Sequence, residues 1–239
     1  MERKNFLRNS FTALGLVAVA PLMNACKKED VSGSTTPTTG GSSGNGSCTE
    51  APTETQGPYP TKQPSAYVRS NIVDDRTGVP FTVTITIQNT NNSCAALANA
   101  IVDIWHCDAA GNYSEYGGTG MQSTNYQSVH FLRGRQETNS DGLASFRTIF
   151  PGWYSGRAPH IHVHVYDSSG NSLLVTQIAF PTDVCNTVYT TATTLYTKGT
   201  QDTSNASDNI FSDSLDSELA TVTGSIAEGY LLKKTIVVS

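Results

Sequence analysis

Charged residues are scarce in this chain of 239 residues, at 15% of the composition, and basic residues are not in excess, since the formal net charge is −5. A nucleic-acid-binding surface needs a basic patch, so this balance argues against a nucleic-acid partner. Segments with helical periodicity are also nearly absent, and no internal repeat is visible. Thr, Ser, Gly and Asn are abundant instead, which favours strands and turns over long helices.

The apolar stretch FTALGLVAVAPLM near the N-terminus is too short to span a bilayer as a helix. It follows the basic segment MERKNFLRNS and precedes a small residue before Cys26, which is the arrangement of an export signal. The sequence LMNAC resembles a bacterial lipobox, in which the cysteine becomes the lipidated first residue of the mature protein. We therefore expect residues 1–26 to be a signal peptide and Cys26 to carry a lipid anchor. A plain cleaved signal peptide is the alternative.

Residues 27–47 are rich in Gly, Ser and Thr, a composition typical of a flexible tether. Residues 48–239 are expected to form one domain. A lipid anchor followed by a tether would hold this domain close to a bacterial membrane, on the periplasmic side or at the cell surface. The lipid anchor would be its only contact with the membrane.

Cysteine is sparse, with five residues in the chain, and removing Cys26 leaves four. An even number of cysteines in an exported protein indicates two disulfides, for which three connectivities are possible. Cys94 and Cys107 flank a strand-like run, so we predict that they pair. The second disulfide would then join Cys48 to Cys185. Four unpaired buried thiols are the alternative.

Short alternating segments separated by turn signals run through the domain. Residues 80–90, PFTVTITIQNT, place apolar side chains on one face and polar ones on the other, the pattern of a half-buried antiparallel strand. Further strands are expected at residues 99–108, 142–150, 160–167, 172–180, 218–224 and 229–238. Many short strands with regular turns indicate a sandwich or a barrel. We predict an all-β fold, a single β-sandwich of mostly antiparallel strands with few short helical turns.

Three of the five histidines lie within the segment HIHVH. Alternate residues of a strand share a face, so His160, His162 and His164 point the same way while the residues between them face the core. Two neighbouring imidazoles on one face are well spaced to hold one metal ion. The role of His164 stays open, as a supporting or structural histidine.

Histidine pairs suit zinc, copper or iron, and no carboxylate stands at metal-ligand spacing near these histidines. Two tyrosines are the remaining donors, Tyr113 in AAGNYSEY and Tyr154 in FPGWYSG. A ferric ion can hold a phenolate ionised well below the free phenol pKa of about 10. Two tyrosinates and two histidines would leave a coordination position open for chemistry, whereas a structural zinc site closes all four.

Four stretches together resemble the intradiol ring-cleavage dioxygenases, the catechol 1,2- and protocatechuate 3,4-type enzymes: TETQGPYP, VDIWHCDAAGNYSEY, NSDGLASFRTIFPGWYSGRAPHIHVHV and TQIAF. They are spread over residues 51–181, and the chain looks closest to a short, exported branch of that family. The resemblance implies that non-haem Fe(III) is held by Tyr113, Tyr154, His160 and His162. It also implies that Arg157, Gln177 and Tyr154 take part in catalysis and that Tyr59 borders the substrate cavity.

The activity implied by the resemblance is cleavage of a catechol-type diol by O2 to a muconate-type dicarboxylic acid. Two alternatives remain: a non-catalytic, tethered β-sandwich that binds a ligand, and a zinc or copper protein that uses the histidine cluster. Trp105 is expected in the core. Arg133 and Arg135 either line the mouth of the cavity or face water, and His106 lies on the strand that leads to Tyr113. The oligomeric state is open.

Overall fold

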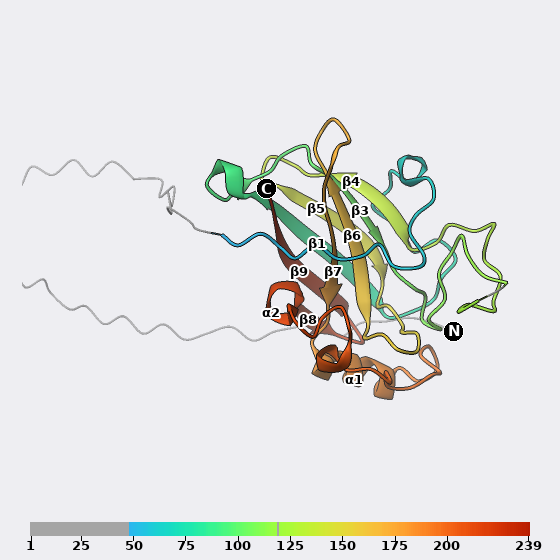
Figure 1. The fold of residues 1–239 in the computed structure, drawn as a ribbon. Coiled ribbons are helices and arrows are strands. Elements are labelled where there is room, and N and C mark those ends of the chain that lie inside the picture. Colours follow the sequence, from blue (N-terminus) through green and yellow to red (C-terminus); the bar gives the residue numbers. More distant parts are fainter. Residues whose placement is uncertain (1–47, 119) are drawn as a thin grey trace, which may run out of the picture. The chain divides into compact units, whose positions relative to one another are not determined.

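The computed structural model describes residues 48–118 and 120–239 (Figure 1). The predicted signal peptide, the tether and the Cys26 anchor site lie outside these residues. Within the described part, nine strands form two sheets, and the predicted all-β sandwich is confirmed. No helix in this part is long and apolar enough to cross a membrane.

The first sheet joins strands from the beginning and the end of the domain, and the second is built from strands in its middle. The first sheet contains β1 (Pro80–Asn89), β2 (Ala95–Ala96), β5 (Leu143–Ile149), β8 (Thr221–Ser225) and β9 (Gly229–Val238). The second sheet has the order β4 (Arg133–Glu137), β3 (Ile101–Trp105), β6 (His160–Tyr166) and β7 (Ser172–Ala179). The strand pairs are antiparallel, as predicted, except that β1 and β9 run parallel.

The core lies between the two sheets and follows from the period-two pattern of their strands. In β1 the side chains of Phe81, Val83, Ile85 and Ile87 are at most 2% exposed, and they belong to the same apolar cluster as the intervening residues of β6. Burial of such side chains stabilises the fold by roughly 1.5–3 kcal/mol each. The opposite face of β6 carries the three histidines, and it is buried as well.

The main helix is longer than the short helical turns expected from the sequence. Helix α1 (Thr182–Thr191) buries Cys185, Val188 and Tyr189 against the core. The Tyr189 hydroxyl donates a hydrogen bond to the Pro151 carbonyl at 2.9 Å. The helix therefore fixes the turn that leads into Tyr154. The remaining helical segments are short: η1 (Pro64–Ala66), η2 (Thr90–Asn92), η3 (Asn205–Ser207) and α2 (Leu215–Glu218).

Residues 48–62, which we call the N-terminal strap, run in extended form beside both sheets (Figure 1). The Ala51 amide donates to Val237 of β9 at 2.9 Å, and the Glu54 amide donates to Val175 of β7 at 2.7 Å. Because β7 lies next to β6, this path brings the strap over the histidine-bearing face.

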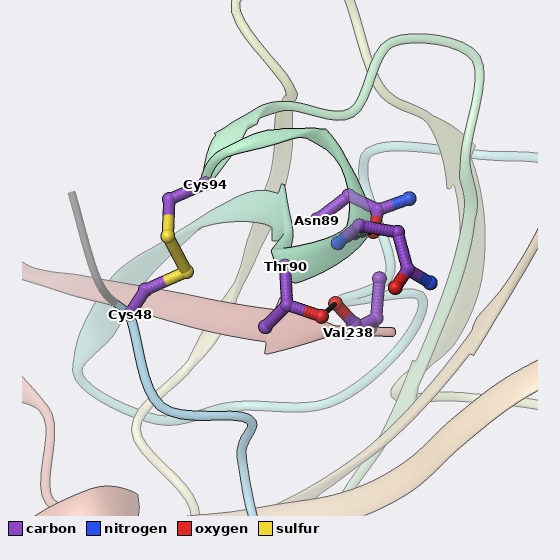
Figure 2. The surroundings of a disulfide bond; sticks show 6 residues. Cys48, Asn89, Thr90, Cys94 and Val238 are labelled. Atoms are coloured by element: carbon purple, nitrogen blue, oxygen red, sulfur yellow. Dashed lines mark hydrogen bonds between the residues drawn. A yellow bond between two sulfur atoms is a disulfide. The ribbon is translucent and has the colours of Figure 1, made fainter. Parts of the chain in front are cut away.

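The start of the strap is fixed by a disulfide that joins Cys48 to Cys94, with 5.9 Å between their Cα atoms (Figure 2). The predicted pairs Cys94–Cys107 and Cys48–Cys185 are therefore wrong. Strand β3 lies between Cys94 and Cys107, and its five residues span roughly 17 Å in extended form. A disulfide needs Cα atoms within about 7 Å, so the strand that suggested the pairing keeps the two residues apart.

Cys107 and Cys185 are free, buried thiols. Burial raises the pKa of both thiols above the ordinary value, so they stay protonated at neutral pH. Each therefore packs as a small apolar side chain.

Candidate metal centre

Sheet register places one row of side chains across three strands. His162 of β6 is paired with Trp105 of β3 on one side and with Gln177 of β7 on the other. Residues directly opposite in a sheet share a face, so these three side chains lie next to one another. The Trp105 indole stacks on the His162 ring with centroids 4.9 Å apart and planes 3° from parallel. Trp105 thus belongs to the site as well as to the buried interior.

His160 lies one step along the same face, and its ring orientation is fixed by the backbone. Its Nδ1 donates to the Ala158 carbonyl at 2.6 Å, so Nε2 keeps a free lone pair. That Nε2 faces the Tyr113 hydroxyl at 3.2 Å. Burial, with the nearby charge of Arg157, lowers the pKa of His160 to about 3. The ring is therefore neutral, which is the form that binds metals.

His162 is fully buried, and neither of its ring nitrogens has a hydrogen-bond partner. Burial, followed by the proximity of His160, lowers the pKa of His162 well below the ordinary value. An unpaired buried polar group costs about 1–3 kcal/mol, so a native protein rarely keeps one without a purpose. The Nε2 atoms of these two neutral histidines are therefore suited to a metal ion.

The strap approaches His162 closely at Gly57. A Cβ atom at this position would lie 2.8 Å from the His162 Cε1 atom, and the backbone φ of Gly57 is +66°. Only glycine meets both conditions without strain. This contact explains how the strap closes over the histidine.

The two predicted tyrosine ligands reach the histidines from separate turns. Tyr113 follows a turn in which Asp108 accepts hydrogen bonds from two backbone amides, and its own amide donates to Gln122 at 2.7 Å. The ring of Tyr154 lies 5.9 Å from that of Tyr113 and 5.6 Å from that of His160. The four predicted ligands, Tyr113, Tyr154, His160 and His162, therefore surround one small volume.

Without a cation, both phenols stay protonated. Burial raises the pKa of Tyr113 well above 10. Burial also raises the pKa of Tyr154, against the lowering effect of Arg157. A bound trivalent cation would reverse this preference, because a nearby positive charge favours the ionised phenol.

Arg157 and Gln177, the other predicted catalytic residues, are joined directly. The Arg157 Nη2 atom donates to the Gln177 Oε1 atom at 2.8 Å, and Gln177 Nε2 donates to the Thr55 carbonyl of the strap at 3.0 Å. The Arg157 Nε atom donates to Asp208 at 2.8 Å. Both residues are therefore held rigidly beside the ligand cluster.

Tyr59 borders the cluster, where the sequence predicted a wall of the substrate cavity. Its ring stacks on Tyr113 with centroids 4.8 Å apart and meets Tyr154 edge-on at 6.3 Å. Tyr59 also lines a surface pocket of about 470 Å³ together with Lys62 and Tyr116. Tyr59 is the residue that this surface pocket shares with the cluster, and neither predicted tyrosine ligand lines it.

His164 lies on the same face but outside the cluster. Its Nε2 contacts the Ser172 hydroxyl at 2.8 Å, and its Nδ1 contacts the Tyr166 hydroxyl at 2.9 Å. His106 is likewise occupied, by the Cys107 carbonyl and by Thr148. In residues 48–118 and 120–239, no three His, Cys, Asp or Glu side chains gather to hold a metal.

Other residues of the site carry no clear signal in the sequence. Arg133, for which the sequence allowed two positions, is buried and donates to the Ser114 carbonyl at 2.6 Å and the Tyr59 carbonyl at 3.1 Å, so it fixes the strap to the Tyr113 turn. Arg135 instead pairs with Asp103. Asp208 stands 51 residues after Arg157, and no local pattern signals the pairing.

The fold is a β-sandwich in which two tyrosines and two histidines surround one volume. The family model described as dioxygenase matches residues 55–213, which is more than half of the chain. The chain belongs to this family, the intradiol ring-cleavage dioxygenases. The predicted resemblance is confirmed.

Solved structures and a curated relative agree with this assignment. An intradiol ring-cleavage dioxygenase from Tetranychus urticae is 28% identical, with a TM-score of 0.71 over 80% of this chain and 95% of that chain. The dioxygenase domain of a dioxygenase–carbohydrate-binding protein fusion from Streptomyces sp. SirexAA-E is 26% identical, with a TM-score of 0.58 over 79% and 97%. Catechol 1,2-dioxygenase 1 of Acinetobacter lwoffii is 30% identical over a 95-residue alignment, which covers 32% of this chain and 29% of that protein. The match thus spans less than a third of that curated relative.

Proposed function

We propose that this protein uses non-haem Fe(III) and O2 to cleave a catechol-type diol between its two hydroxylated carbons, which yields a muconate-type dicarboxylic acid. One observation carries the proposal: two phenols and two neutral imidazoles surround one volume, and the His162 nitrogens there have no other partner. Membership of the intradiol family supports the same chemistry.

The donor set suits a ferric ion. Tyr113 and Tyr154 would bind as phenolates, and His160 and His162 as neutral imidazoles, so the protein would contribute two negative charges. This partly neutralises a trivalent cation and leaves room for both oxygens of a diol. When bound, Fe(III) would supply the Lewis acidity and the template that make the ring of the diol reactive towards dioxygen.

The residues around the ligands would have distinct tasks. Tyr154, which lies beside Arg157, would accept a phenolic proton as the diol binds. The Arg157 guanidinium would stabilise negative charge that develops on the ring, an electrostatic role. Gln177, held by Thr55 and Arg157, would orient the diol or dioxygen. Tyr59 would form the wall past which the substrate enters.

The test is metal analysis of the purified protein with a visible spectrum, followed by oxygen uptake against a panel of catechols. We expect about one iron per chain, a tyrosinate-to-Fe(III) absorption band, and one O2 consumed per diol. A folded protein that takes up no iron and stays colourless after ferric reconstitution would exclude the proposal. Ligand binding without oxygen uptake would indicate the non-catalytic module instead, and bound zinc or copper would indicate the third alternative.

We also propose that the protein is exported and anchored through a lipid on Cys26. The signal-like sequence of residues 1–26 supports this, as does the Cys48–Cys94 disulfide, because disulfides persist in oxidising compartments. Labelling of producing cells with a radioactive fatty acid should mark the mature protein that begins at Cys26, and should not mark the Cys26→Ala variant. Equal labelling of both would refute the anchor.

A further inference from the structure

Asp208 occupies a position that neither the sequence motifs nor the ligand set assigns. It directly follows η3, and the Asn205 side chain of that element donates to the Phe180 carbonyl at 2.9 Å, just after β7 ends. The side chain of Asp208 is completely buried. A buried carboxylate is costly unless its charge and its lone pairs are satisfied, so its partners reveal its purpose.

The first partner is Arg157. The Arg157 Nε atom donates to the Asp208 Oδ2 atom at 2.8 Å, while Nη2 of the same guanidinium donates to Gln177 at 2.8 Å. Two acceptors on different elements fix a planar guanidinium in one orientation. Its side chain is only 11% exposed, so water cannot replace either acceptor easily.

The second partner is the backbone that orients a metal ligand. The same Asp208 Oδ2 atom accepts a hydrogen bond from the Ala158 amide at 2.6 Å. The Ala158 carbonyl in turn accepts from His160 Nδ1 at 2.6 Å, which directs His160 Nε2 towards Tyr113. One carboxylate oxygen is therefore connected both to the arginine and, through a single residue, to the histidine.

The other oxygen of the carboxylate is also used. Asp208 Oδ1 accepts from the Ile210 amide at 2.9 Å, so the side chain is held from its own loop. The carboxylate cannot rotate without losing a hydrogen bond to Arg157, to Ala158 or to Ile210. Its geometry is thus set before any substrate or metal arrives.

We propose that Asp208 is a positioning residue that couples the two halves of the site. It aims the Arg157 guanidinium at the reacting diol, and through Ala158 it holds His160 in the orientation that binds iron. This inference rests on the proposed function. Asp208 itself would contact neither the substrate nor the metal.

Asp208→Asn is the principal test because it keeps the shape and removes the charge. Partners that orient catalytic groups and metal ligands contribute about 10–100-fold. We expect kcat to fall by that factor with a smaller change in KM, because the arginine acts on charge that develops after binding. We also expect ferric affinity, measured by competition with a chelator, to fall several-fold.

The variant Arg157→Gln separates the two connections of Asp208, the one to Arg157 and the one through Ala158 to His160. In the Arg157→Gln background, Asp208→Asn should change kcat by less than about twofold, because residues that act as a unit are not additive. Its effect on ferric affinity should persist there, since the Ala158–His160 connection does not pass through Arg157. Additive losses of kcat, or unchanged ferric affinity in both backgrounds, would overturn the proposal.

Asp202→Asn is the matched control. Asp202 is exposed, and it accepts hydrogen bonds from Ser155 and Gly156, in the turn that leads into Arg157. It does so without contacting Arg157 or Ala158. Its substitution should leave kcat and ferric affinity within about twofold of wild type, whereas a loss equal to that of Asp208→Asn would refute a specific role.

Asp208→Glu is the second variant in case Asp208→Asn does not fold. It keeps the charge and displaces it by one methylene, and wild-type kcat and ferric affinity in this variant would also refute the proposal. If the wild-type protein binds no iron, the proposed function fails. The Arg157–Asp208 coupling is still measured, as non-additivity in unfolding free energy across the same double-mutant cycle.

Discussion

The contact between Gly57 and His162 makes a sharp prediction about the strap. In Gly57→Ala the new Cβ would lie 2.8 Å from His162 Cε1 and 3.4 Å from its Nε2. Cβ atoms do not approach a ring that closely, so either the strap or the imidazole must move. Trp105 stacks on the same ring, so the imidazole cannot shift without losing that contact.

Gly57→Ala is expected to have two effects, one on stability and one on function. Gly57 has a φ of +66°, a region in which alanine costs about 1–2 kcal/mol, and this lowers the unfolding free energy. The displacement of His162 adds to this cost and also acts on function. A misplacement of about 1 Å can cost on the order of 100-fold in rate, so we expect kcat to fall by at least tenfold and ferric affinity to fall with it.

Gly170→Ala is the control that separates the effect on stability from the effect on function. Gly170 has a φ of +86°, and no atom lies within 4 Å of the position that a Cβ would take there, so it has the backbone cost without the contact. Thermal unfolding, ferric titration and oxygen uptake would be measured on both variants. A loss of stability in Gly57→Ala at least as large as in Gly170→Ala, with iron binding lost only in Gly57→Ala, would support the reasoning. Iron binding and turnover in Gly57→Ala that match those of Gly170→Ala would refute it.

Three further predictions concern the disulfide, a ligand and acid stability. Replacing Cys48 and Cys94 by serine should lower the unfolding free energy by about 4 kcal/mol in a denaturant titration, because the bond joins residues 46 apart; wild-type stability that is insensitive to reductant would contradict this. Tyr154→Phe should lower turnover at least 100-fold and shift the visible band, whereas Tyr116→Phe should keep the band; identical spectra for both variants would remove the ligand assignment. Burial lowers the pKa of His106 from 6.5 to about 4. Because the folded-state pKa is the lower one, the stability that neutral His106 contributes is complete above pH 6.5 and declines as the pH falls, by about 3 kcal/mol at pH 4. Urea unfolding at pH 7 and pH 4 should therefore show a smaller acid loss in His106→Gln, and equal losses would contradict this origin.

Most strands could be predicted because their signal is local. In β1 and β6 the side-chain alternation of a strand is written in consecutive residues, and the structure follows it. Strand β4 has no such signal, since its sequence RGRQE is polar and Arg133 is buried by hydrogen bonds rather than by apolar contacts. Helix α1 is longer than its sequence indicates because packing of its buried face against the sandwich stabilises it.

The sequence by itself determined which donors were available and how the histidines are presented. His160 and His162 share a face because they are two residues apart in a strand, a property of backbone geometry that needs no tertiary information. The motif match then indicated Tyr113 and Tyr154.

Only the tertiary structure decided which distant residues meet. The partner of Cys48, the placement of Gln177 beside His162 and the pairing of Asp208 with Arg157 all depend on strand register and on where loops return. The physical reason is the distance along the chain between the residues that determine each feature. Side-chain direction within a strand is set by neighbouring peptide units, whereas the distance between residues 51 apart is set by the packing of the whole sandwich.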